Sequence, residues 1–273
     1  MEMEWLKITG PAFKNYLAAG DAVAVLPLGS IEKHGPHLPM GTDTLNAEYV
    51  CREACSRAGA LMLPPLAYTF VNEMKASAGT ISLSARTLLS LLEEICDDVA
   101  RNGIKKIILA NSHGGNNYVA MTFIQDLPGK GKDYVVYYLS LSSCLSPERR
   151  EKIKALRKTD VPGGHACDNE TDLTLFENPD LVDLDALPTD KSAGLSVQDF
   201  DVAPALPQIW WYAMYPDSLA GDPRFPSPER GALIVEGMIE KFAETITKVR
   251  ADKRAAEVNA SFEIEARNPE KMH

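Results

Sequence analysis

Histidines of this 273-residue chain are concentrated in three short, glycine-containing loops. The loops read GSIEKHGPHLPMGTD, NSHGGNN and PGGHACDNETD, and each also carries carboxylates or asparagines. Four of the five histidines lie there: His34, His37, His113 and His165. Imidazole and carboxylate groups are the ligands that proteins offer to Zn and Mn. The sequence therefore predicts a metal site assembled from three separate loops.

The first loop directly follows an apolar run at 22–28. Glu32 and His34 are two residues apart, so in extended backbone their side chains point the same way. Asp43 comes nine residues after His34, and the glycines and prolines between them favour a turn that brings it back. One Glu, one Asp and one or two His suit Zn or Mn, with Fe as a third choice. A structural turn with surface charges is the alternative.

The second loop follows the apolar run 106–110 in the same manner. His113 precedes Gly114 and Gly115, where the absence of side chains lets the backbone approach a ligand closely. Asn116 opens the next helix, whose N-terminus favours an anion. The alternative interpretation is that His113 is a buried core residue whose hydrogen bonds are satisfied by the protein and that it binds no ligand.

The third loop places His165 after two glycines and ahead of three acidic residues, Asp168, Glu170 and Asp172. Acidic residues in a first helical turn can merely complement the helix dipole. That interpretation suits Asp172 best. Glu170, five residues beyond His165, is the stronger candidate for a ligand.

The elements that must position these loops are apolar runs of strand length alternating with helical patterns. No run alternates cleanly between apolar and polar residues, which is typical of parallel strands buried on both faces. We expect strands at 22–28, 60–66, 106–110 and 134–141. We expect helices at 46–57, between Ser84 as N-cap and Gly103 as the stop, at 117–127 and at 229–253. The pattern predicts an α/β sandwich with a mostly parallel sheet.

One domain over residues 1–273 is expected, because no linker and no internal repeat divides the chain. It carries a long irregular excursion around 178–227, and the last dozen residues are expected to fray. The aromatic cluster Trp210, Trp211 and Tyr212 could wall a substrate pocket, but a subunit interface or the core is the favoured place for it.

Composition excludes several classes of protein. The net charge of −10 argues against nucleic acid, which needs a basic surface. No apolar run reaches the roughly 20 residues that span a bilayer, and the acidic N-terminus is unlike a signal peptide. We therefore expect a cytoplasmic protein with a small-molecule substrate and no membrane partner. Five cysteines without a C-x-x-C pair predict no disulfide framework.

Together the three loops resemble those of the creatininase (creatinine amidohydrolase) family. The family patterns are E-x-H-G-P-H-L-P-x-x-T-D, N-x-H-G-G-N and H-A-G-x-x-E-T. Here the corresponding stretches are EKHGPHLPMGTD, NSHGGN and HACDNET in the same order, and GTISLS also matches. The resemblance covers about residues 20 to 180. It implies a single three-layer α/β/α domain, two divalent metal ions and a homo-oligomer, commonly a hexamer.

The resemblance also implies roles for the loop residues. Asp43 would bridge the two metals, Glu32 and His113 would complete one site, and His34 would belong to the other. His165 would handle protons or hold the water that reacts.

This chain departs from creatinine hydrolases around the substrate. Those enzymes carry a second-metal glutamate where Gly115 stands, so we infer that Glu170 supplies the missing carboxylate and is both a ligand and a catalytic residue. Creatinine hydrolases also carry a tryptophan just before the third-loop histidine, and in this chain Val161 and Pro162 stand in that stretch. Cys167 replaces a glycine, and Met74 replaces a histidine. We therefore expect a paralogue that acts on a different substrate.

The expected reaction is attack of metal-activated water on an amide, cyclic amide or formamide carbon. Amides near Gly114 and Gly115 could hold the developing oxyanion, and Glu73 is expected to contact substrate. His37 and Asn116 would support the ligands from behind. The alternatives are family hydrolysis of another bond, in a keto-inositol or at a peptide end, and a non-catalytic metal-binding interaction protein.

Overall fold

A four-stranded parallel sheet forms the centre of the molecule, in the order β2-β1-β3-β4. The computed structural model describes residues 2–196, 200, 202 and 204–269. The strands are β1 (Val23–Leu28), β2 (Leu61–Met62), β3 (Lys106–Asn111) and β4 (Val135–Ser140). The four predicted strands are thus confirmed. The run at 60–66 forms only a two-residue strand because Pro64 and Pro65 cannot donate to a ladder.

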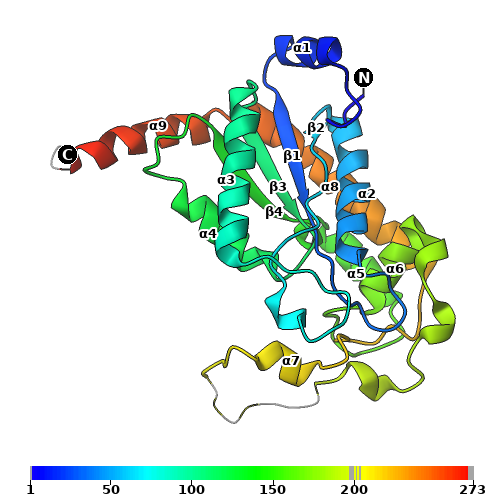
Figure 1. The fold of residues 1–273 in the computed structure, drawn as a ribbon. Helices are drawn as coiled ribbons and strands as arrows, with labels where there is room; N and C mark the ends of the chain where they lie inside the picture. Colours follow the sequence, from blue (N-terminus) through cyan, green and yellow to red (C-terminus); the bar gives the residue numbers. More distant parts are fainter. Residues whose placement is uncertain (1, 197–199, 201, 203, 270–273) are drawn as a thin grey trace.

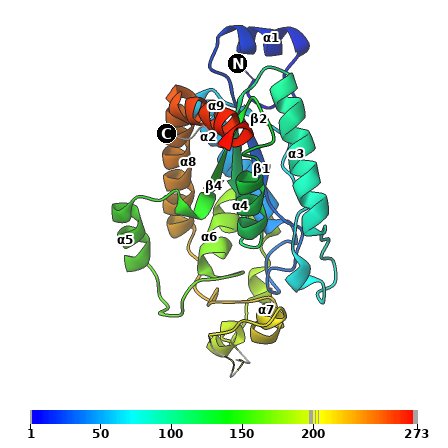
Figure 2. The ribbon, with the colours of Figure 1, turned by 90° about the vertical axis from the view of Figure 1, so that its left-hand side faces the viewer.

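Successive residues of β1 point into two different cores, which makes the molecule three layers thick. Val23 and Val25 pack in one core with residues of α2, α6 and α8. Ala24 and Leu26 pack in the other with residues of α3 and α4. Figure 2 shows α8 and α3 on opposite sides of the strands. The predicted α/β/α sandwich is confirmed, except that the edge strand β4 is only half-buried.

Most helices begin and end near the predicted residues, with two corrections. α2 begins at Thr42, four residues before the expected start, so Asp43 lies inside its first turn. Fraying of the last dozen residues is wrong for 262–267, which belong to a helix that follows Asp252, whose Oδ1 accepts the Arg254 N–H at 2.9 Å; residues 270–273 lie outside the described part of the chain. Ser84 caps α3 as expected, accepting a bond from Thr87 N–H. The α-helices are α1 (Gly10–Ala18), α2 (Thr42–Ala58), α3 (Ala85–Arg101), α4 (Asn116–Asp126), α5 (Pro147–Ala155), α6 (Asp168–Glu177), α7 (Trp210–Met214), α8 (Pro228–Ala251) and α9 (Arg254–Arg267).

The described residues between 178 and 227 form short helical turns and loops that lie beyond the carboxyl ends of the strands (Figure 1). They include the 3-10 helices η3 (Pro179–Leu181), η4 (Leu184–Ala186) and η5 (Lys191–Gly194), as well as α7. Two further 3-10 helices, η1 (Asn72–Met74) and η2 (Leu141–Ser143), border the same end. Within the described ranges, no helix is long and apolar enough to cross a membrane.

Helix α6, which carries Glu170, is fastened to α8 by a buried ion pair. Arg230 and Asp172 are both almost fully buried, and the Arg230 guanidinium donates to the Asp172 carboxylate. The backbones also approach closely, since a Cβ at Gly231 would lie 2.1 Å from the Asp172 carbonyl oxygen. Breaking such a pair leaves an uncompensated buried charge, so α6 has one firmly specified position.

Candidate metal centre

The three histidine loops meet at the carboxyl ends of β1 and β3, as the order of elements predicts. A first group of possible ligands joins Glu32, Asp43 and His113. His113 Nδ1 lies 2.7 Å from Glu32 Oε1 and 3.0 Å from Asp43 Oδ2. All three residues are at least 95% buried. This is a closed cluster of one imidazole and two carboxylates, with both carboxylates from the first loop and the imidazole from the second.

A second group shares Asp43 and adds His34 and Glu170. His34 Nε2 lies 3.4 Å from Asp43 Oδ1 and 3.9 Å from Glu170 Oε2. A third combination joins Glu32, His34 and His165, with His165 Nε2 lying 4.0 Å from Glu32 Oε2. Because its two carboxylate oxygens face different imidazoles, Asp43 is placed to bridge two cations.

Backbone carbonyls set which nitrogen of each histidine faces the carboxylates. His34 Nδ1–H donates to Glu32 O at 3.2 Å, and His113 Nε2–H donates to Phe70 O at 3.2 Å. The remaining nitrogens, His34 Nε2 and His113 Nδ1, are therefore directed at the carboxylate cluster. His34 Nε2 is fully buried and has no hydrogen-bond partner among the described residues. An orphaned nitrogen beside two carboxylates fits a metal ion.

The charge balance of the cluster also fits cations. Burial lowers the pKa of His34, but the carboxylates of Asp43 and Glu170 raise it to about 10. The pKa of His113 is likewise raised by Glu32 and Asp43 against the effect of burial. Burial raises the pKa of Glu170 to about 7. Within the described residues no Lys or Arg pairs with these carboxylates, so divalent ions would supply the missing positive charge.

Ser30 is a site residue that the sequence interpretation missed. Its hydroxyl is fully buried and lies 2.7 Å from Asp43 Oδ2 and 3.0 Å from Glu32 Oε1. The hydroxyl donates to these carboxylates and so fixes their orientation. The signal was available, because Ser30 precedes Glu32 by two residues and therefore shares its side of an extended strand end.

His165 is held beside the cluster in one protonation state. Its Nε2–H donates to Lys33 O at 2.8 Å, which leaves Nδ1 unprotonated. Burial, and then the neighbouring His34, lower the pKa of His165 to about 4. The His34 and His165 rings are 4.1 Å apart, and the Trp211 ring meets His165 edge-on at 5.9 Å. Trp211 therefore borders the site. Because no residue of α7 is buried, the core is excluded as the place of this aromatic cluster, and a subunit interface stays a prediction.

Two residues expected behind the ligands make different contacts. The His37 Nε2–H donates to Thr171 Oγ1 at 2.8 Å, rather than to a ligand carboxylate. Since Thr171 follows Glu170 in α6, His37 ties the first loop to the third. Asn116 Nδ2 donates to Gly29 O at 3.0 Å and joins the ends of β3 and β1. Cys167 belongs to none of the ligand groups, and burial raises the pKa of its thiol to about 12.

Gly115, where creatinine hydrolases carry a glutamate, has no room for a side chain. A Cβ there would lie 2.5 Å from His113 Nε2 and 2.8 Å from Glu73 Oε1. Glu73 thus occupies the space beside His113, and burial raises its pKa. At the neighbouring Gly114, by contrast, a Cβ would meet nothing within 4 Å. A side chain can therefore be added at Gly114 without a clash but not at Gly115.

We predict that Gly115→Ala lowers metal affinity by roughly 10- to 100-fold, the usual effect of disturbing a ligand's support, because His113 must move. Gly114→Ala, one residue away, should bind metal like the parent protein. Titration of both variants with zinc against a competing chelator measures the difference. Equal affinities for the two variants would contradict this account of His113.

The comparisons with known proteins agree with this geometry. A family model described as creatinine amidohydrolase matches residues 6–246. A creatinine amidohydrolase of Pseudomonas putida is 31% identical over 258 residues, covering 88% of this chain and 94% of the relative. A mycofactocin precursor peptide peptidase of Mycobacterium ulcerans (strain Agy99) is 31% identical over 235 residues, covering 82% and 84%. A solved structure described as "Creatininase Mn" superimposes with a TM-score of 0.76 at 28% identity, covering 91% of this chain and 98% of that one.

Proposed function

Because this chain belongs to the creatininase family, we propose that it is a metal-dependent hydrolase that cleaves a C–N bond of a small molecule. The bond would be an amide, a cyclic amide or a formamide. The observation that carries the proposal is Asp43, whose carboxylate is shared by two ligand groups built from different loops. A purely structural metal site needs neither a shared carboxylate nor such a position at strand ends, and usually contains cysteine.

The residues divide into two sets of ligands around the shared carboxylate. Glu32 and His113 would hold one ion with Asp43, while His34 and Glu170 would hold the other. Divalent ions bound there would polarise a carbonyl oxygen and make water a nucleophile near neutral pH. Zn and Mn suit this set best, and Fe is also compatible with it.

Proton transfer is the proposed role of His165. With Nε2–H committed to the Lys33 carbonyl, Nδ1 is the atom that can accept a proton and pass it to a leaving nitrogen. Its pKa, lowered to about 4 by burial and by His34, leaves the imidazole neutral at pH 7, so Nδ1 is free to accept a proton. Trp211, packed edge-on against the ring, would limit the access of bulk water to this step.

A substrate panel with matched metal states tests the proposal. The purified protein would be assayed on formamides, lactams, creatinine and keto-inositols, first as isolated, then after chelation, and then after Mn or Zn is restored. We expect hydrolysis of at least one formamide or lactam, loss of activity on chelation, and recovery on restoring metal. Chelation-insensitive hydrolysis, or hydrolysis of keto-inositols alone, would contradict a metal-dependent C–N hydrolase.

A peptide end is the second candidate substrate, and the similarity to a peptide peptidase favours it. The bond would still be an amide, so the same ligands and the same proton acceptor would serve. Creatinine itself is disfavoured, because Gly115 and Glu73 alter the neighbourhood of His113. Adding short peptides to the panel separates these substrates directly.

A further inference from the structure

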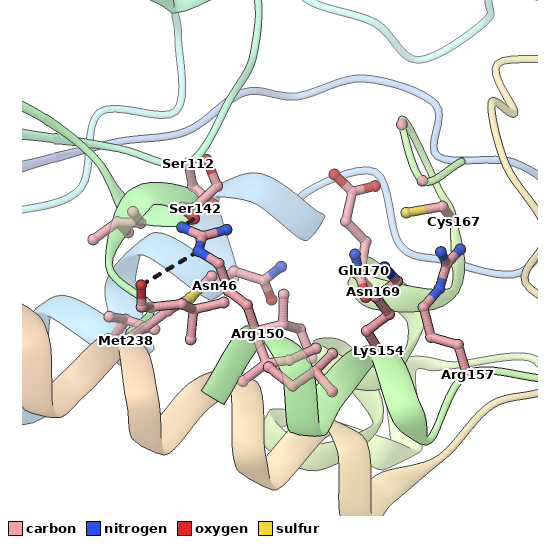
Figure 3. A pocket seen from close by; sticks show the side chains of 18 residues that line it. Asn46, Ser112, Ser142, Arg150, Lys154, Arg157, Cys167, Asn169, Glu170 and Met238 are labelled. Carbon is pink, nitrogen blue, oxygen red and sulfur yellow. Dashed lines mark hydrogen bonds between the residues drawn. The ribbon is translucent and has the colours of Figure 1, made fainter. Parts of the chain in front are cut away.

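A cavity of about 450 Å³ opens beside the metal centre, between α2, η2, α5, α6 and α8. Its volume suits a small organic molecule. Glu170 lines it and belongs to a ligand group as well, and with a side chain 21% exposed it is more open to solvent than Asp43 or His34 of that group. Figure 3 shows Glu170 among the side chains around the cavity. The cavity therefore reaches the metal centre at Glu170.

An unsatisfied amide faces the cavity from the metal side. Asn46 lies one helical turn after Asp43 in α2 and is only 4% exposed. Its Oδ1 is buried and has no hydrogen-bond partner among the described residues, and the same is true of Asn169 Oδ1. Buried polar atoms are normally paired, so these oxygens point to a ligand that donates hydrogen bonds, as an amide N–H does.

Two cationic residues of α5 also line the cavity, and neither is paired with a carboxylate among the described residues. Lys154 and Arg150, one turn apart on α5, both line the cavity. Within the described residues Arg150 donates to backbone carbonyls alone, at 3.1 Å to Ser142 O and at 3.3 Å to both Ser143 O and Leu145 O. Lys154 is exposed and has no ion-pair partner within the described residues. In a chain of net charge −10, two cations without carboxylate partners at one cavity favour an anionic ligand.

Apolar side chains make up another part of the lining. Ile153, Leu173, Ile234 and Met238 line the cavity and are all at least 92% buried. Their surface suits an aliphatic or aromatic group rather than a sugar. A phosphate dianion would require more compensation than one free ammonium and one guanidinium already bonded to carbonyls, so a carboxylate suits these two cations better.

We propose that the substrate is an acylated amine that carries a carboxylate, with its carboxylate at Lys154, its apolar part on Ile153 and Leu173, and its amide at Asn46 and Glu170. An N-acyl amino acid with an apolar side chain has this chemistry. The inference rests on the proposed hydrolase, whose substrate class it narrows. The bond that is cleaved would then lie at the Glu170 end of the cavity.

Binding of two isosteric probes tests the carboxylate site without requiring turnover. Calorimetry on the metal-loaded protein would compare 4-methylpentanoate with the neutral 4-methylpentanamide. We expect the acid to bind about fivefold more tightly than the amide, an advantage worth about 1 kcal/mol. Lys154→Gln should abolish this advantage, whereas Lys152→Gln, on the same helix but outside the cavity lining, should retain it. A carboxylate bound only at a metal ion would not respond to Lys154→Gln.

The outcomes separate this inference from the proposed function. Acid preference that depends on Lys154 supports the carboxylate site even if the substrate panel shows no hydrolysis. Equal binding of acid and amide, or a preference untouched by Lys154→Gln, overturns it even if formamides are hydrolysed.

Discussion

Replacing Asp43 by alanine should remove both metal ions and reduce hydrolysis by roughly 1,000-fold or more, since a lost Lewis acid costs several kcal/mol of transition-state stabilisation. Two of the three ligand combinations contain this carboxylate, one through Oδ2 beside His113 and one through Oδ1 beside His34. Each group would keep only two ligands and lose a negative charge. Elemental analysis after dialysis measures the metal content, and turnover is measured on whichever panel substrate the parent protein cleaves.

Asp98→Ala is the matched control for this substitution. Asp98 pairs with Arg101 on the exposed face of α3 and touches none of the ligand groups. It should retain both metal and activity, and circular dichroism would show that both variants are folded. If Asp43→Ala kept its metal and its activity, the two-ion interpretation of the site would be wrong.

The part of this site that could be predicted from the sequence consists of candidate ligands that lie a few residues apart within one loop. Glu32 and His34 are two residues apart, a spacing that puts both side chains on the same side of extended backbone. The second and third loops each carry a candidate ligand of their own. Parallel strands end at one edge of a sheet, which brings such loops together. The start of α2 was placed too late because Thr42, Asp43 and Thr44 are weak helix formers, although Asp43 favours a first turn.

The remainder depends on contacts between distant residues, for which the sequence holds no local signal. The carbonyl that orients His113 belongs to Phe70, and the space at Gly115 is taken by Glu73. Trp211 reaches His165 from a segment without periodicity. The cavity joins Asn46 of α2 to side chains of α5, α6 and α8. Tertiary packing alone decides these neighbours.

Glu170→Gln and Glu32→Gln should each remove one metal ion and leave the other, so that metal content falls from about two to about one per chain. Glu170 belongs only to the group with His34 and Asp43. Glu32 belongs to two combinations, but its shortest contact is with His113 Nδ1 at 2.7 Å, so we assign it to the ion held by Asp43 and His113. Glutamine keeps the size of the side chain but removes its charge, so the fold is retained. The double variant should bind almost no metal, which elemental analysis of all three proteins would show.

Glu73→Gln is the control that decides which carboxylate replaces the glutamate absent at Gly115. Glu73 is the carboxylate beside that position, since its Oε1 would be 2.8 Å from a Cβ there, yet it belongs to none of the ligand groups. Glu170 arrives from another loop but faces His34, whose orphaned Nε2 marks the second ion. As the carboxylate that binds the second ion, Glu73 is favoured by its closeness to Gly115, whereas Glu170 is favoured because its carboxylate faces His34 Nε2. Two ions in Glu73→Gln and one in Glu170→Gln is the result we expect, and the reverse pattern would assign the second ion to Glu73.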